Sequence, residues 1–406
     1  MLKTAVDFAS AANSSSRVGK DLPVVYPDLA SDLIPWFHEN MRRLPWRGSY
    51  EAYEVWLSEI MLQQTQMERG TQYFESWLRR FPSIRSVAEA APDAVLKAWE
   101  GLGYYSRVRN FQKAAKLVME RHDGRLPEDY ASLRALPGIG EYTAGAILSI
   151  AFNQPVPAVD ANVERVFARL FDIDAPVKSA AASDFIRHMA ENLIPEGQAR
   201  LFNQALMELG ALVCSRTPKC EICPLAAHCQ ARRLGIAAER PVPRKKVSYE
   251  ALEIISGALV HKGRIFLQKR LDSGVWAGFW EFPGGKLEQG ESPDEGIVRE
   301  FGEETDFQIT VSKCLGTVRH AHTRYRIRMH CFLCSLSSAC GPAEENGGYP
   351  VPSLNAATEY RWVRLEELYD EQGFTMPAGH RKFLDMWRPE LERALMPSSG
   401  DADPIM

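Results

Sequence analysis

The sequence predicts two domains, an all-helical domain followed by a domain of mixed α and β structure. Its 406 residues exceed what one ordinary hydrophobic core organises. From about Pro35 to Leu234, apolar residues recur every three or four positions, which is the helical period. Beyond residue 250 the apolar period falls to two, which is the period of strands. The change of period therefore predicts the multidomain fold class.

The domain boundaries follow from local composition. The first residues are serine-rich and poor in aromatic side chains, which predicts a disordered tail. A run that mixes prolines with basic residues, Glu239–Val247, is typical of an exposed connector. We therefore expect a tail at 1–25, a helical domain at 26–235, a linker at 236–250, a second domain at 251–395 and a tail at 396–406.

Individual elements can be assigned from the same periods. In the helical domain, one buried helix face is predicted for Tyr53, Trp56, Leu57, Ile60 and Met61, and another for Phe202, Ala205, Leu206 and Leu209. No convincing strand interrupts this domain. In the second domain, strands are expected at Glu253–Val260, Arg264–Gln268 and around Tyr325–His330.

Composition limits the class of protein. The chain is 45% hydrophobic and 25% charged, which is typical of soluble globular proteins. It contains neither an apolar run of transmembrane length nor a secretory signal pattern. We expect a monomer without a membrane partner, in the cytoplasm or nucleoid of a bacterium. The net charge of -4 argues against nucleic-acid binding unless basic residues cluster locally.

Four of the eight cysteines lie close together, at Cys214, Cys220, Cys223 and Cys229. In a chain without an export signal, such a group indicates metal or cluster ligation rather than disulfides. Soft thiolates suit an iron–sulfur cluster, and four of them also suit zinc. Cys331 and Cys334 differ, because residues three apart on a strand point to opposite faces. We expect these two to be buried structural cysteines.

Several motifs of the helical domain resemble one superfamily. The turn Leu136–Gly140 opens a helix, and Gly138 and Gly140 would let backbone amides approach a phosphate. Together with Val159–Val166 and the cysteine group, this turn resembles the helix-hairpin-helix DNA glycosylases. Within this superfamily, three segments resemble the adenine glycosylases of the MutY type: Leu44–Arg47, Trp56–Gln66 and Gly101–Arg107. The resemblance covers roughly residues 30–235.

This resemblance implies that Glu59 protonates adenine and that Asp160 stabilises the positive charge of the sugar. Asn162 would hold Asp160 or a water molecule. The chemistry itself requires two carboxyls in different environments, one protonated and one ionised, because glycosidic cleavage passes through an oxocarbenium-like state. Glu59 lies at the flank of the apolar stripe, where desolvation would raise its pKa. Asp160 precedes a helix and can also serve as its N-cap.

Position 142 separates two relatives. Enzymes similar to endonuclease III have a lysine there, which attacks the sugar and permits strand cleavage. Tyr142 cannot form that Schiff base, so we expect a monofunctional glycosylase. A bifunctional glycosylase/lyase is the alternative enzyme.

The resemblance also implies DNA and cofactor contacts. Gln64 and Tyr104 would enter the duplex beside a flipped base, and Arg107 would bind phosphate. Positions that line the adenine pocket in the family are Arg42, Leu44, Trp46, Arg47, Leu62 and Gln204, although core packing is an alternative for the leucines and the tryptophan. A [4Fe-4S] cluster is implied at the four cysteines. Their first spacing is five residues instead of the usual six, which leaves zinc open.

The second domain resembles the Nudix family. The residues from Gly285 to Phe307 match its signature except for Asp306, where glycine is usual, and Trp280–Lys286 strengthens the match to MutT-like nucleotide hydrolases. Glu300, Glu303 and Glu304 share one helix face and could bind Mg²⁺.

Two functions are open for this domain. It could recognise 8-oxoguanine opposite adenine, with Thr323 where the family has a lesion-contacting serine, or it could hydrolyse oxidised nucleoside triphosphates. For the whole chain we expect excision of adenine from duplex DNA with 8-oxoguanine:adenine or guanine:adenine mispairs. A Nudix hydrolase with a DNA-binding helical domain is the alternative from another class.

Overall fold

A computed structural model describes residues 28–243, 249–322, 324–337, 344–345, 348–370 and 373–396. The tail predicted at 1–25 lies outside the described residues, as do most of the tail at 396–406 and the basic residues 244–248 of the linker. By their contacts, residues group into two units: Met1–Ala90 with Ser106–Lys245, and Ala91–Tyr105 with Lys246–Met406. Among the described residues, no helix combines the length and apolarity needed to cross a membrane.

The division at residue 245 falls inside the predicted linker, but the assignment of Ala91–Tyr105 to the second unit was not predicted. The reason is packing between residues far apart in the sequence. The ring of Tyr105 stands edge-on to Phe279, with 4.4 Å between centroids. Glu100 accepts a hydrogen bond from Arg381 at 3.0 Å. Long-range contacts of this kind leave no local sequence pattern.

The described part of the first unit contains helices and turns but no strand, as predicted. Its longer helices are α1 Leu29–Asn40, α3 Ala52–Met61, α4 Met67–Arg80, α7 Ser106–Arg121, α10 Ala161–Leu170, α11 Ala180–Asn192 and α12 Ala199–Leu212. Shorter helices are α2 Trp46–Ser49, α5 Ile84–Glu89, α8 Tyr130–Ala135, α9 Glu141–Ala146 and α13 Gln230–Arg233, and short 3₁₀ or π turns are η1 Ile147–Ala151, η2 Cys220–Ile222, η3 Ala226–His228 and η4 Ala237–Glu239. In the second unit, α6 spans Pro92–Ala98.

Apolar faces hold these helices together. One core joins α1, α10, α11 and α12, and a smaller one joins α3 to η1. The predicted face of α3 is largely confirmed, because Trp56, Leu57, Ile60 and Met61 are buried and only Tyr53 is partly exposed. Burial of such side chains contributes about 2 kcal/mol each, so packing fixes how α3 is rotated.

The second unit contains a six-stranded sheet. Its strand order is β3-β2-β1-β5-β4, with β8 also paired to β2; β1 and β5 are parallel and the other pairs antiparallel. The strands are β1 Glu250–His261, β2 Arg264–Arg270, β3 Trp280–Glu281, β4 Ile309–His322, β5 Tyr325–Leu336 and β8 Ala357–Val363, with a separate pair β6 Glu344–Glu345 and β7 Tyr349–Pro350.

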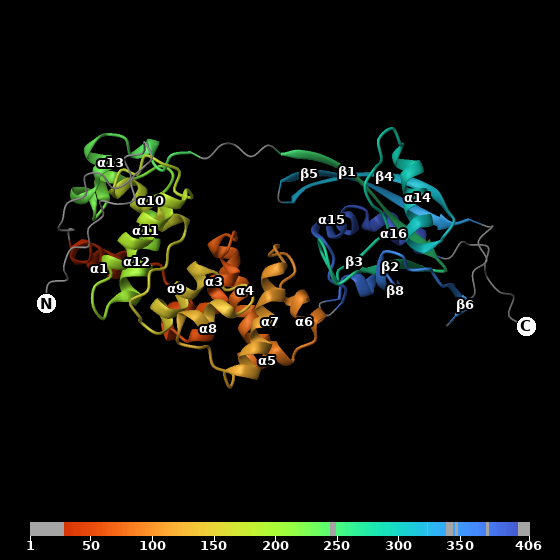
Figure 1. Cartoon of the computed structure of the whole chain (residues 1–406). Coiled ribbons are helices and arrows are strands. Elements are labelled where there is room, and N and C mark those ends of the chain that lie inside the picture. Colours follow the sequence, from red (N-terminus) through yellow and green to blue (C-terminus); the bar gives the residue numbers. More distant parts are fainter. Residues whose placement is uncertain are drawn as a thin grey trace, which may run out of the picture. The chain divides into compact units, whose positions relative to one another are not determined.

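Helices cover both faces of this sheet (Figure 1). One face packs against α14 Pro293–Thr305, and the other against α15 Ala378–Met386 and α16 Arg388–Leu395, with a short 3₁₀ turn η5 at Glu366–Leu368. Cys331 belongs to the core under α15, whereas Cys334 belongs to the core under α14. Both are buried on opposite faces, as the strand period predicted.

Helix α14 has well-formed ends. Ser292 caps its N-terminus in a reciprocal pair with Glu295, and Pro293 is its first residue. Asp306 ends it in the left-handed conformation with φ of 59°. An aspartate tolerates this conformation better than most residues, so the replacement of the usual glycine leaves the helix end intact.

Candidate active site

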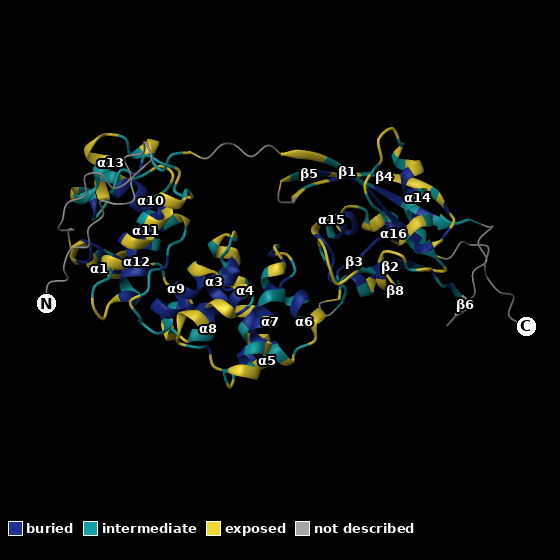
Figure 2. Cartoon of the chain, viewed as in Figure 1, coloured by how far each residue is buried: buried dark blue, intermediate teal, exposed yellow. Residues whose placement is uncertain are grey.

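The Glu59 side chain is the central group of the first unit. It lies on α3, a largely buried helix (Figure 2), and is only 9% exposed between apolar neighbours. Burial raises the pKa of its carboxyl to about 7, with a further upward contribution from Asp160. A carboxyl with this pKa is partly protonated at neutral pH and can act as an acid.

Tyr142 is the direct partner of this carboxyl. Its hydroxyl donates a short hydrogen bond to Glu59 Oε2. The pKa of Tyr142 is raised well above its ordinary value, first by burial and then by the neighbouring charge of Glu59. The phenol therefore stays protonated and remains a hydrogen-bond donor. It has no amine that could attack a sugar.

Asp160 is the second carboxylate, held at the start of α10. Its Oδ1 caps the helix by accepting from the Val163 amide at 2.8 Å, and Oδ2 accepts from Asn162 Nδ2 at 2.7 Å. Burial raises the pKa of Asp160, whereas both hydrogen bonds favour its ionised form. Asp160 thus caps α10 and also lies near Glu59. Because Asp160 accepts these hydrogen bonds and Glu59 does not, the two carboxyls have different environments.

Asn162 is fixed in turn by its neighbours. Its Oδ1 accepts from Arg165 Nη2 at 2.8 Å. Helix α12 approaches closely at Gly210, where an added Cβ would lie 2.6 Å from the Asn162 Cβ. Ala161 is the first residue of α10 and is not among the residues with positive φ. The backbone at position 161 therefore does not require glycine.

The hairpin turn before α9 has the geometry expected of an anion site. Gly138 has a φ of 81°, and an added Cβ would lie 2.8 Å from Asn110 Cβ. Gly140 faces open space, with no atom within 4 Å of a would-be Cβ.

Beside Tyr142, a cleft of about 440 Å³ is lined by Glu141, Val159, Lys178 and other residues of α9 to α11. This volume is within the range of small-ligand pockets.

Two arginines predicted for the adenine pocket share one partner. Arg42 and Arg47 both donate to the buried carboxylate of Glu208, at 2.8 Å in each case. Glu208 was not predicted as a site residue from the sequence. It is a glutamate within the apolar run of α12, and this unusual position is a signal that could have identified it. Gln204 lies one turn earlier, is buried and donates to the Arg200 carbonyl.

The remaining residues predicted for the adenine pocket differ in how far they are buried. Trp46 is 6% exposed and packs edge-on against Phe74 at 5.0 Å, which agrees with the alternative of core packing. Leu44 and Leu62 are partly exposed and remain accessible to a ligand.

Gln64 and Tyr104, the predicted duplex-entering residues, are both exposed and have positive φ values of 58° and 48°. Non-glycine residues adopt this conformation at a cost, and such sites often serve function. Arg107, which is predicted to bind phosphate, also contacts the protein backbone. Its Nη1 donates to the Ile60 and Met61 carbonyls at 2.9 and 3.1 Å, and thereby holds the end of α3 before Gln64.

The four clustered cysteines line one cavity together with Arg169 and Arg232. All four are free thiols, and Arg169 Nη1 lies 3.3 Å from Cys214 Sγ. Four soft donors that face a common space beside cationic side chains fit an iron–sulfur cluster. Arg165 connects this loop to the active site, because its Nε donates to the Cys214 carbonyl at 2.7 Å.

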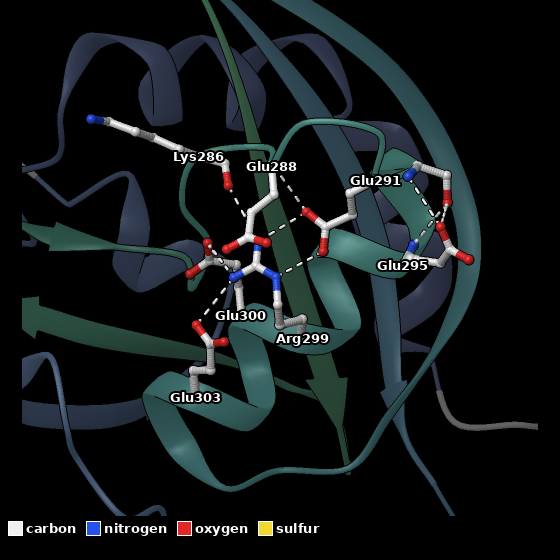
Figure 3. Close-up of polar contacts among 8 residues, drawn as sticks. Lys286, Glu288, Glu291, Glu295, Arg299, Glu300 and Glu303 are labelled. Atoms are coloured by element: carbon white, nitrogen blue, oxygen red, sulfur yellow. Dashed lines mark hydrogen bonds and ion pairs between the residues drawn. The ribbon is translucent and has the colours of Figure 1, made fainter.

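One arginine of α14 binds three carboxylates, two of them on the same helix (Figure 3). Arg299 donates to Glu291 at 2.7 Å and to both Glu300 and Glu303 at 3.1 Å. Glu304 points elsewhere and accepts from Gln268 at 2.7 Å and from the Gly284 amide at 3.1 Å.

Carboxylate oxygens are suitable donors for Mg²⁺. Within the described residues, however, the carboxylates of α14 do not form a group of three or more side chains that could hold a metal ion. Arg299 instead occupies the space between Glu300 and Glu303. As placed, these residues do not fit the predicted Mg²⁺ site.

Family models agree with this arrangement. Residues 57–191 match the HhH-GPD superfamily base excision DNA repair protein, 215–229 match the iron-sulfur binding domain of endonuclease III, and 256–386 match the NUDIX domain. The fold and the site thus define a base-excision DNA glycosylase that carries an iron–sulfur cluster, and zinc is not supported.

Similar proteins identify the family within this class. The chain is 36% identical to the adenine DNA glycosylase of Buchnera aphidicola subsp. Baizongia pistaciae, over 62% of this chain and 72% of the relative. It is 35% identical to that of Homo sapiens, over 83% and 70%, and 39% identical to that of Mycolicibacterium smegmatis, over 51% and 70%. The chain belongs to the adenine DNA glycosylase family.

Proposed function

We propose that this protein hydrolyses the N-glycosidic bond of adenine that is mispaired with 8-oxoguanine or guanine in duplex DNA. The observation that carries the proposal is the pairing of two unlike carboxyls. Glu59 is buried with a pKa of about 7; burial also raises the pKa of Asp160, but the hydrogen bonds from the Val163 amide and Asn162 favour its ionised form. Adenine as the substrate also agrees with the names of the relatives.

In the proposed reaction, Glu59 donates its proton to a ring nitrogen of the extruded adenine. The bond from N9 to C1′ breaks, and its electron pair stays with the base. Asp160 stabilises the positive charge that develops on the sugar. Water then adds to C1′ and gives its proton to the Glu59 carboxylate that the first step left ionised, with Asn162 holding Asp160 in place.

We propose that the product is an abasic site in an intact strand. No Schiff base can form at Tyr142, and its hydroxyl is engaged by Glu59. Efficient β-elimination by the purified protein would instead indicate a bifunctional enzyme. The cluster is proposed to be of the [4Fe-4S] type, which iron and sulfide in equal amounts without zinc would support.

For the second unit we propose recognition of 8-oxoguanine. The proposal is supported by the match of residues 256–386 to the NUDIX domain in a chain whose relatives are adenine DNA glycosylases. Thr323, the residue predicted to contact the lesion, lies outside the described residues. Nucleotide hydrolysis is the weaker candidate, because Arg299 already engages the carboxylates that a metal would need.

Single-turnover excision of adenine from an 8-oxoguanine:adenine duplex tests the proposal. We expect Glu59→Gln to slow excision by about a thousandfold, the middle of the range for loss of a general acid. Glu54→Gln is the matched control on the same helix, because Glu54 bonds only to Ser49 in the described contacts. Excision by Glu59→Gln at the wild-type rate would overturn the assignment, and equal rates with a thymine:adenine duplex would overturn the mispair specificity.

A further inference from the structure

The buried carboxylate of Glu208 has an unusually complete set of partners. Its side chain is 1% exposed on α12. Oε1 accepts from the Arg42 backbone amide at 2.9 Å and from Arg42 Nε at 2.8 Å. Oε2 accepts from Arg42 Nη2 at 3.0 Å and from Arg47 Nη2 at 2.8 Å. One side chain thus fixes two arginines that are five residues apart in the sequence.

These contacts also determine local charge. The arginine hydrogen bonds lower the pKa of Glu208 to about 2 despite its burial. It is therefore ionised throughout the working range of pH, and the group of Arg42, Arg47 and Glu208 carries one net positive charge. Arg47 lies close enough to Glu59 to favour the ionised form of that carboxyl.

Glu59 is surrounded by groups with opposing effects. Tyr142 from α9 donates to it, and Arg47 from α2 attracts its negative charge, so both favour ionisation. Burial on α3 and the charge of Asp160 before α10 favour the protonated form. An uncompensated second cation near Arg47 would shift this balance towards ionisation.

We propose that Glu208 is a positioning residue: it holds Arg42 and Arg47 in place and cancels one of their charges, so that Glu59 keeps its proton at neutral pH. This inference rests on the proposed role of Glu59 as the acid. Glu208 itself acts through the arginines and donates no proton in the reaction.

The test compares pH profiles of single-turnover excision. Glu208→Gln keeps the shape of the side chain but leaves two positive charges beside the site. We expect the alkaline limb to move down by about one pH unit, because a shift of one unit corresponds to a tenfold change in the protonated fraction. The rate at pH 7.5 should then fall about tenfold, whereas the rate at pH 5.5 should stay within about threefold of wild type.

A charge-balanced double variant separates this effect from damage to the fold. Glu208→Gln combined with Arg42→Gln restores one net positive charge, and we expect the alkaline limb to return to within about 0.3 units of wild type. Equal loss of rate at every pH in both variants would show a purely structural role and overturn the proposal. If Glu208→Gln does not fold, Arg42→Gln alone changes the net charge in the opposite direction, so titration of the ¹³C-labelled Glu59 carboxyl should show a raised pKa, and an unchanged pKa in this variant contradicts the proposal.

The two failures are distinguishable. If Glu59→Gln remains active, the proposed acid is wrong. If Glu59→Gln is inactive but Glu208→Gln keeps the wild-type pH profile, only the role of Glu208 is wrong.

Discussion

Carboxylates dominate the candidate chemistry of both units, but their surroundings differ. In the first unit, Glu59 is buried and its direct partner is a neutral phenol. In the second, Arg299 forms ion pairs with Glu291, Glu300 and Glu303. The comparison teaches that the position of the arginine matters. A glutamate can transfer a proton where a nearby arginine is engaged by another carboxylate. Where an arginine binds the glutamate directly, it neutralises the negative charge of that carboxylate.

The largest expected effect tests whether excision belongs to the first unit alone. Asp160→Asn removes a charge but retains the N-cap, because asparagine caps helices as well as aspartate does. We expect single-turnover excision to fall about a thousandfold with little loss of stability. Asp129→Asn, the same substitution at the N-cap of α8, is the matched control. Glu303→Gln in the second unit should leave excision within about twofold, and a large loss there would break the comparison.

The next effect concerns the protonation of Glu59. With a pKa of about 7, the wild-type excision rate should decline at higher pH, by about tenfold per unit well above this pKa. Tyr142→Phe removes a donor to the ionised carboxyl, so the pKa should rise and the alkaline limb should move to higher pH. The measurement is the pH profile of both proteins. A limb that moves down in Tyr142→Phe would contradict the assignment.

A smaller effect would sharpen the role of the second unit in binding DNA. The end of the β4–β5 hairpin presents exposed Arg319, Arg324, Arg326 and Arg328, and the guanidinium of Arg326 lies over the Tyr249 ring at 4.9 Å. If this surface contacts phosphates, Arg326→Gln should reduce the slope of log affinity against log salt by about 0.9. Arg361→Gln, on β8, is the exposed control. Identical slopes for wild type and Arg326→Gln would place this arginine away from the DNA backbone.

The smallest expected effect is on nucleotide hydrolysis. Because Arg299 engages Glu300 and Glu303, we expect Mg²⁺-dependent hydrolysis of 8-oxo-dGTP by wild type to equal that by Glu304→Gln. The assay measures pyrophosphate and phosphate release. Hydrolysis that is specific to the wild type would reveal a second enzyme and remove the contrast between the units.

The sequence was most informative where function depends on local pattern. The apolar spacing of α3 predicted that Glu59 lies beside a buried stripe, and the strand period predicted opposite faces for Cys331 and Cys334. Asp160 could likewise be recognised as an N-cap from its position before an amphipathic run. In each case the relevant neighbours lie within a few residues.

The features that could not be predicted depend on contacts between distant residues. Glu208 binds Arg42 across 166 positions, and no local period records such a pair. The positive φ of Gln64 and Tyr104 is equally hidden, because neither residue type requires that conformation. Tertiary packing determines both, so motif matching finds the reacting groups more readily than the residues that hold them.

Arg165 gives the cysteine loop a consequence beyond local stability. Its guanidinium joins the Cys214 carbonyl to Asn162, which in turn holds Asp160. Disorder in the loop would thus free Asn162 and leave Asp160 held by its N-cap contact alone, while the helices around it stay folded. We therefore expect loss of iron to lower excision more than it lowers the amount of folded protein.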